Sequence, residues 1–230
     1  MSPTPDAEQP LILASRSPRR QEAMAALGLA FRVAVSEVEQ TAGAIAPGAD
    51  PTDPVPIALA KARDIGARHA LAFVLAGDTI VAHEGEALGK PAGPAEARAM
   101  LRRLAGATHT VRTGLALLHL RRGFLATAEV ASDVVMRQYD DAEIVRYVES
   151  GEPLDCAGAY DVHRQGGALV AAVTGCFSAV VGLPIAATAA LLRRAGLAVP
   201  REPAAVCARL YGRPCPAATP QTAGLCNAHE

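Results

Sequence analysis

One carboxylate in this sequence stands where it could do chemistry. Asp78 follows the apolar run Phe73–Gly77, and a second β-prone run, Thr79–His83, begins directly after it. We therefore expect Asp78 where one strand ends and the next begins, held by a rigid scaffold and open at a sheet edge. A carboxylate there could hold a divalent cation or accept a proton from water. In the simpler interpretation, Gly-Asp-Thr only forms a turn.

Basic side chains gather at the expected start of the first helix. Ser17 suits the capping position of that helix, and Pro18 suits its first turn. Arg16, Arg19 and Arg20 lie around them, although a helix dipole disfavours cations at an N-terminus. The cluster indicates an anion bound by guanidinium groups and free backbone N–H groups together. A basic face exposed to solvent is the alternative.

Further charged residues could serve the same chemistry. Glu37 and Glu39 alternate with Val38, so in an extended segment their carboxylates point to the same side. They could share a cation with Asp78, or they could form an exposed edge. Lys90 lies between a glycine and a proline, which stiffen the chain and suit a lysine that reaches a phosphate. The residues around it do not form a Walker A loop.

The segments that position these residues alternate between strands and helices and include a long hairpin. Expected strands cover residues 11–14, 31–35, 73–77, 79–83, 108–120, 124–136 and 168–173. Expected helices follow Ser17 and Asp53 and cover residues 94–104, 140–150 and 185–195, the last of these being the final helix. The hairpin among strand–helix units predicts an α/β fold with a mixed β-sheet and flanking helices, rather than a fully parallel sheet.

Composition limits the kind of protein. The chain has 230 residues, of which 50% are hydrophobic and 20% charged, with a formal net charge of −1. These values fit one soluble globular domain, or two small lobes around a cleft. The near-neutral charge argues against a general nucleic-acid binder, and no apolar run approaches the ~18 residues of a membrane span. The start of the chain lacks the features of a signal peptide, so we expect a cytoplasmic protein without a membrane partner.

We expect three segments along the chain. Residues 1–10 form a flexible tail, residues 11–199 one folded domain, and residues 200–230 an irregular tail rich in proline and cysteine. The five cysteines are an odd number and indicate reduced thiols. A zinc site in an interaction module is a separate alternative, although its spacing matches no tight zinc knuckle. Its ligands would be Cys207, Cys215, Cys226 and His229.

Five motifs follow one another in a fixed order. They are Leu13-Ala-Ser-Arg-Ser-Pro-Arg-Arg20, Ala76-Gly-Asp-Thr-Ile-Val81 with Leu88-Gly-Lys-Pro91, Gly106-Ala-Thr-His-Thr-Val-Arg-Thr-Gly114, Tyr147-Val-Glu-Ser-Gly-Glu-Pro-Leu-Asp-Cys-Ala-Gly-Ala-Tyr160 and Val181-Gly-Leu-Pro184. Together they resemble the Maf family of nucleoside triphosphate pyrophosphatases, also called septum formation inhibitors. The resemblance covers about residues 11–197. Each motif is weak alone, but five in this order are highly specific.

The resemblance implies an activity and a fold. Members hydrolyse nucleoside triphosphates to the monophosphate and pyrophosphate with a divalent metal, and are thought to clear surplus or non-canonical nucleotides. Their fold is a twisted mixed sheet in two lobes around a cleft, as in the related inosine triphosphatases, and they often form homodimers. Overproduction has been linked to blocked septum formation. A nucleotide-binding regulator of cell division with little catalysis is therefore the alternative to an enzyme.

The resemblance also implies roles for individual residues. Asp78 matches the family's catalytic acid, and Ser15 matches its loop serine. A divalent cation, Mg²⁺ or Mn²⁺, would bind Asp78 together with Glu37 or Glu39. The phosphate-binding basic residues match Arg19, Arg20, Lys61 and Lys90.

The chain departs from the family pattern at the positions that select the base. Members that prefer dTTP and UTP match this chain at Arg19 and Thr79 but carry glutamine where it has His163. Asp161 and Arg164 stand in place of glycines, so the base preference is open.

A second departure concerns the expected metal site. The loop ends in Gln40 where the family often has an acid, and Gln40 is a poorer metal ligand for which Glu39 could substitute. Reduced activity would follow if that acid binds the metal.

Overall fold

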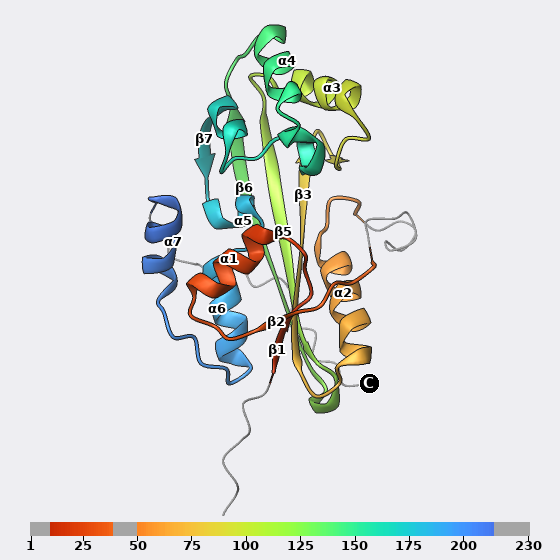
Figure 1. Cartoon of the computed structure of the whole chain (residues 1–230), viewed down its shortest axis with the longest axis vertical. Coiled ribbons are helices and arrows are strands. Elements are labelled where there is room, and N and C mark those ends of the chain that lie inside the picture. The colour runs from red at the N-terminus through yellow and green to blue at the C-terminus, as the bar shows by residue number, and fades with distance from the viewer. Residues whose placement is uncertain (1–9, 39–49, 214–230) are drawn as a thin grey trace, which may run out of the picture.

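The protein is built on one mixed β-sheet, seen here in a computed structural model that describes residues 10–38 and 50–213 (Figure 1). The seven strands are β1 (Leu11–Leu13), β2 (Arg32–Val33), β3 (Phe73–His83), β4 (Glu86–Leu88), β5 (Thr108–His119), β6 (Phe124–Met136) and β7 (Val170–Thr174). Their order is β2-β1-β3-β5-β6-β7, and β4 also pairs with β3. β1 is parallel to β2 and β3, whereas the other pairs are antiparallel, which confirms the predicted mixed sheet.

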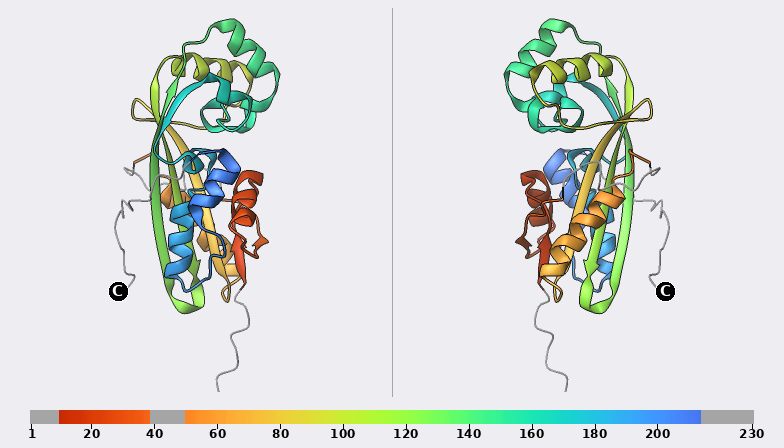
Figure 2. Two further views of the ribbon diagram at one scale, coloured as in Figure 1. Left: turned by 90° about the vertical axis from the view of Figure 1, so that its left-hand side faces the viewer. Right: turned by 90° about the vertical axis from the view of Figure 1, so that its right-hand side faces the viewer.

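Helices cover both faces and one end of this sheet. They are α1 (Pro18–Ala26), α2 (Val55–Arg68), α3 (Pro94–Leu104), α4 (Asp141–Glu149), α5 (Phe177–Val181), α6 (Ile185–Arg194) and α7 (Pro203–Tyr211). Short 3₁₀ turns are η1 (Leu120–Arg122), η2 (Glu152–Asp155), η3 (Ala157–Ala159) and η4 (Gln165–Leu169). Figure 2 shows α6 and α7 on one side of the long strands and α2 on the other. Among residues 10–38 and 50–213, none of the helices combines the length and the hydrophobicity that a bilayer span requires.

The two faces of the central strands form separate cores at the lower end of the molecule. Leu13 and Leu75 pack with residues of α1, α6 and α7 in one core. Ile12 and Val74, their immediate neighbours, pack with α2 in another. The alternation follows from the strand period of two, which turns successive side chains to opposite faces. We call this part, with α1, α2, α6 and α7, the lower lobe.

A third core forms the upper lobe, which contains α3, α4, η2 and η3. Val81 of β3 and Val111 of β5 pack there against Leu101 of α3 and Ile144 of α4. The strands β3, β5 and β6 run from one lobe into the other (Figure 1). Asp78 lies on β3 between the residues that enter the lower cores and those that enter the upper core.

The expected strand break at Asp78 is wrong, because β3 is one continuous strand of 11 residues. β5 pairs with it from Val74 to Ala82, and this ladder includes the pair Asp78–Gly114. Tertiary pairing therefore overrides the turn propensity of Gly-Asp-Thr. On the opposite side β1 pairs only with 73–75 and β4 only with 81–83. In the described chain, the part of β3 around Asp78 thus has a strand neighbour on one side only.

Elements with strong local signals match their predictions. The hairpin of β5 and β6 turns through η1 and Gly123, which has the left-handed φ of 61° that favours glycine. α3 has the predicted bounds, Pro94–Leu104. α4 begins with a capping box in which Asp140 and Glu143 bond to each other's backbone N–H groups.

The predicted C-terminal tail is wrong for its first part, because residues 203–211 form α7. Pro203 occupies the first turn of the helix, where the missing N–H costs nothing, so proline starts this helix rather than preventing it. Val206 and Cys207 are buried in the core with α1 and α6, so Cys207 packs as an apolar side chain. α6 is therefore not the final helix, and the remaining zinc candidates Cys215, Cys226 and His229 lie outside the described residues.

Candidate active site

Asp78 lies in close contact with a lysine of α2. Its Oδ1 accepts a hydrogen bond from Nζ of Lys61 at 2.6 Å, and the exposed fractions of the two side chains are 8% and 18%. α2 packs on β3 and β5 through the core that contains Ala62 and Ile65, which fixes the helix that carries Lys61. A partly buried ammonium–carboxylate pair is thus held where β3, within residues 10–38 and 50–213, has a strand neighbour on one side only.

Arg20 of α1 joins this site from the other face of the sheet. Its Nη2 donates to Oγ1 of Thr79 at 3.1 Å, its Nη1 to Oγ of Ser15 at 3.3 Å, and its Nε to the carbonyl of Gly182 at 2.8 Å. Burial lowers the pKa of Arg20, whereas the nearby Asp78 carboxylate raises it. Ser15, Arg20, Thr79 and Asp78 therefore belong to one cluster.

Local sequence explains why these partners converge. Gly182 ends α5 at a φ of 116°, a conformation that favours glycine, and its carbonyl accepts the Nε–H of Arg20. Thr79 is fixed from the next strand, because its Oγ1 lies 2.9 Å from Oγ1 of Thr113. Thr113 in turn donates to the carbonyl of Ala179 at 2.8 Å. Thr113 was not among the predicted site residues, although its position in the third motif, Gly106–Gly114, could have indicated it.

Arg19 points to a different partner from Arg20. Its Nη1 donates to Oδ2 of Asp161 at 2.5 Å. The Asp161 side chain is only 3% exposed, whereas the Arg19 side chain is 34% exposed. Oδ1 of Asp161 also accepts the backbone N–H of His163 at 3.0 Å. This ion pair links α1 of the lower lobe to the segment between η3 and η4, and it brings the predicted base-selecting residues Arg19 and His163 into one network.

Comparison with known proteins now places the chain. Residues 10–195 match the family model described as Maf-like protein. The chain belongs to the Maf-like family. It is 46% identical over 195 residues to a dTTP/UTP pyrophosphatase of Anaeromyxobacter dehalogenans, and the alignment covers 84% of this chain and 97% of that protein. It is 46% identical over 192 residues to a dTTP/UTP pyrophosphatase of Myxococcus xanthus, which covers 83% and 94%.

A solved structure gives a more distant match to this Maf-like chain. A HAM1 protein from Coxiella burnetii is 16% identical, with a TM-score of 0.46, and the match covers 81% of this chain and 99% of that one.

Lys90 does not lie in the cluster of contacts around Asp78. Its Nζ donates to Oδ1 of Asp155 at 2.5 Å on the surface of the upper lobe, and the exposed fractions of the two side chains are 63% and 89%. An exposed ion pair of this kind contributes little to stability, so another anion can easily replace Asp155 as the partner of Lys90. Lys90 therefore needs a ligand long enough to reach it, and its predicted phosphate contact stays a prediction.

The predicted metal ligands are only partly placed. Glu37 is exposed, and its segment is held on α2 because Asp64 accepts hydrogen bonds from the Ser36 hydroxyl and the Glu37 backbone, which lower the pKa of Asp64. Glu39 and Gln40 lie outside the described residues. Among the residues that the structure describes, no three His, Cys, Asp or Glu side chains come together as a metal site.

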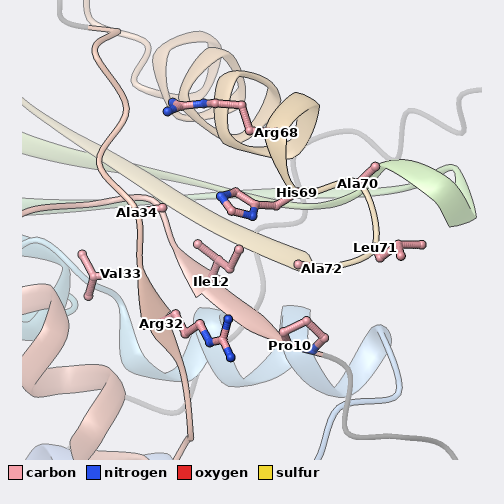
Figure 3. Close-up of a pocket in the computed structure, with 10 residues that line it drawn as sticks. All are labelled: Pro10, Ile12, Arg32, Val33, Ala34, Arg68, His69, Ala70, Leu71 and Ala72. Atoms are coloured by element: carbon pink, nitrogen blue, oxygen red, sulfur yellow. The ribbon is translucent and has the colours of Figure 1, made fainter.

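A separate hollow lies away from these residues. It has a volume of about 330 Å³ and is lined by residues of β1, β2 and the end of α2, among them Arg32, Val33, Arg68 and His69 (Figure 3). None of the predicted site residues that the structure describes lines it.

Proposed function

We propose that this Maf-like protein hydrolyses nucleoside triphosphates to the nucleoside monophosphate and pyrophosphate, with dTTP and UTP as its preferred class. The contact of Lys61 with Asp78 carries the proposal, because it places a cation and a potential base at one point of the sheet. The names of the relatives from Anaeromyxobacter and Myxococcus support the substrate class. The partners of Arg20 support a site that extends from this pair toward α1.

The basic residues would bind the triphosphate. Phosphoryl chemistry demands charge neutralisation and positioning more than covalent help from the protein. Lys61 and Arg20 lie on opposite sides of Asp78, on α2 and α1, and would contact different oxygens of the polyphosphate. Arg19 and Lys90 would contribute after exchanging their carboxylate partners, Asp161 and Asp155, for phosphate. Ser15 would add a hydroxyl donor beside Arg20.

Asp78 would accept the proton of the attacking water. The water oxygen forms a bond to the α-phosphorus, the bond from that phosphorus to the bridging oxygen breaks, and pyrophosphate leaves. The proton passes to the Asp78 carboxylate, whose Oδ1 accepts a hydrogen bond from Lys61 in the structure. Binding of the substrate would draw the Lys61 ammonium toward phosphate, and Asp78 would then act as the base.

A divalent cation would arrive with the substrate, because the described residues hold no group of three His, Cys, Asp or Glu side chains that could bind it beforehand. Mg²⁺ in nucleotide sites is usually held by one or two carboxylates together with phosphate oxygens, and Asp78 supplies one carboxylate. Glu37 or Glu39 would supply a second. The cation, Mg²⁺ or Mn²⁺, would polarise the α-phosphate and lower the pKa of a bound water.

A second candidate function has one observation in its favour. Asp161 already neutralises Arg19, which a catalytic site would use for an anion. A nucleotide-binding regulator of cell division with slow catalysis would tolerate such a pair. Location in the cytoplasm and assembly as a homodimer are further parts of the proposal.

One assay separates the two functions. Purified protein is incubated with dTTP, UTP, CTP and ATP in Mg²⁺ or Mn²⁺, and released pyrophosphate is measured against time. The enzyme predicts catalytic turnover that favours dTTP and UTP. Nucleotide binding by calorimetry without pyrophosphate release favours the regulator and rejects the enzyme.

A further inference from the structure

Helix α7 brings an aromatic ring to a residue of the predicted base site. The Tyr211 ring packs edge-on against the imidazole of His163, with 5.3 Å between the ring centroids and an interplanar angle of 77°. Tyr211 also lies 5.4 Å from the Phe177 ring at the start of α5. Residues distant in sequence thus form one aromatic cluster, which we define as His163, Phe177 and Tyr211.

This helix lies beyond the part of the chain that matches the family. The family match ends at residue 195, and α7 covers Pro203–Tyr211. The alignment with the Anaeromyxobacter pyrophosphatase covers 97% of that protein but 84% of this chain, and the alignment with the Myxococcus pyrophosphatase covers 94% and 83%. α7 is therefore an addition to the family domain, and the contact of Tyr211 with His163 belongs to this addition.

The addition is firmly attached to the helix that carries Arg19 and Arg20. Arg201 Nη1 and Arg209 Nη2 both donate to the carbonyl of Ala26, at 3.2 and 3.3 Å, at the C-terminal end of α1. Cations are stabilising at that end, because it carries the negative pole of the helix dipole. Val206 is buried in the same core as α1. α7 therefore packs against α1 (Figure 1).

Tyr211 also lies within the electrostatic environment of Arg19. Burial raises the pKa of the Tyr211 hydroxyl, and nearby Glu22 of α1 raises it further, whereas Arg19 lowers it. From the other side, the backbone of His163 donates to Asp161, the partner of Arg19. Tyr211, His163, Asp161 and Arg19 thus form a continuous set of neighbours.

We propose that Tyr211 is a positioning residue that orients the His163 ring for contact with the pyrimidine base of the substrate. The inference rests on the proposed nucleotide hydrolysis and adds to it a contribution from α7 to base selection. His163 is exposed, so its ring is accessible to a ligand while Tyr211 restricts its orientation. A neutral imidazole carries one donor and one acceptor nitrogen, which match the carbonyl and N–H groups on the edge of thymine or uracil.

The test is a set of kinetic measurements on the full chain with dTTP, UTP and CTP. Tyr211→Ala should raise KM for the preferred substrate roughly three- to tenfold, the range expected for loss of one aromatic pair. The ratio of kcat/KM for dTTP over CTP should fall by a similar factor, while kcat stays within about twofold because the phosphate site is unchanged. Tyr211→Phe keeps the ring and should restore wild-type values.

Two controls separate positioning from loss of packing. Val206→Ala removes a buried side chain of α7 that is no part of the aromatic cluster, so it should lower Tm without changing the substrate ratio. In a His163→Ala background, Tyr211→Ala should have no further effect on the ratio, as expected of residues that act through one contact.

Three results would overturn the inference. They are an unchanged dTTP/CTP ratio in an active Tyr211→Ala enzyme, the same change in Val206→Ala, and full additivity with His163→Ala. Wild-type protein that releases no pyrophosphate from any nucleotide would reject the proposed function, and this inference with it.

Discussion

Gly114 offers a direct way to move Lys61 without touching it. Gly114 lies opposite Asp78 in the β3–β5 ladder, directly beneath the start of α2. A Cβ atom at this position would lie 2.7 Å from the carbonyl carbon of Pro54 and 2.7 Å from the nitrogen of Val55. Both are backbone atoms, which cannot rotate away as a side chain can. Gly114→Ala must therefore displace the N-terminal end of α2.

The size of the effect follows from this geometry. Restoring an ordinary contact requires a movement of about 0.7 Å, and overpacking of this kind costs about 1–3 kcal/mol of folding stability. For a chain of this size that corresponds to a decrease in Tm of roughly 2–12 °C, at about 2–4 °C per kcal/mol. Displacing a catalytic group by about 1 Å can reduce activity ~100-fold, and α2 carries Lys61. We expect kcat/KM for dTTP to fall roughly 10- to 100-fold.

The assay combines thermal unfolding with steady-state pyrophosphate release. Gly93→Ala is the matched control, because a Cβ atom there meets no heavy atom within 4 Å. Its backbone is extended, with a φ of 175°, so alanine fits without strain. Gly93→Ala should keep wild-type activity. A folded Gly114→Ala enzyme with wild-type kcat/KM, or an equal loss in Gly93→Ala, would refute the reasoning.

Three further predictions concern single side chains. Burial, with a smaller contribution from His83, lowers the pKa of His109 to about 4 from its ordinary 6.5. The folded state therefore favours neutral His109. In urea unfolding, the free energy of unfolding should stay constant above pH 6.5 and fall by up to about 3 kcal/mol as the pH decreases to 4. The same pH dependence of the unfolding free energy in His109→Gln would contradict this origin. Asp161→Asn should lower KM for dTTP roughly threefold or more, because Arg19 becomes free for phosphate, and an unchanged or raised KM in initial-rate measurements would reject that role. Lys90→Ala should change the unfolding free energy by less than about 0.5 kcal/mol, because the ion pair of Lys90 with Asp155 is exposed. The same variant should raise KM for dTTP in initial-rate measurements, and an unchanged KM would remove Lys90 from the phosphate site.

Elements with local signals could be predicted from the sequence. The bounds of α3 follow from the apolar period that buries Ala97, Leu101 and Leu104, and those of α4 from its capping box. The β5–β6 hairpin follows from two β-prone runs around a glycine. These signals depend on neighbours within a few residues.

Features decided by distant partners could not be predicted in the same way. The single strand β3 depends on pairing with β5, which extends the ladder across Asp78. The pair of Arg19 with Asp161 joins residues 142 positions apart. α7 was missed because its prolines favoured an irregular segment, whereas Val206 and Cys207 find a core in the folded protein. The family resemblance assigned Asp78 and Lys61 separately, and their contact was not predicted.

The role of Asp78 can be tested most directly by pyrophosphate release from dTTP in Asp78→Asn, compared with Asp141→Asn as a control. Asp141 is an exposed acid of α4 paired with Arg102, remote from the cluster around Asp78. With native circular dichroism in both variants, Asp78→Asn should lose roughly 10²- to 10⁴-fold in kcat, the range for removal of a general base, while Asp141→Asn keeps wild-type turnover. Wild-type turnover by a folded Asp78→Asn protein would contradict the assignment of Asp78 as the reacting carboxylate.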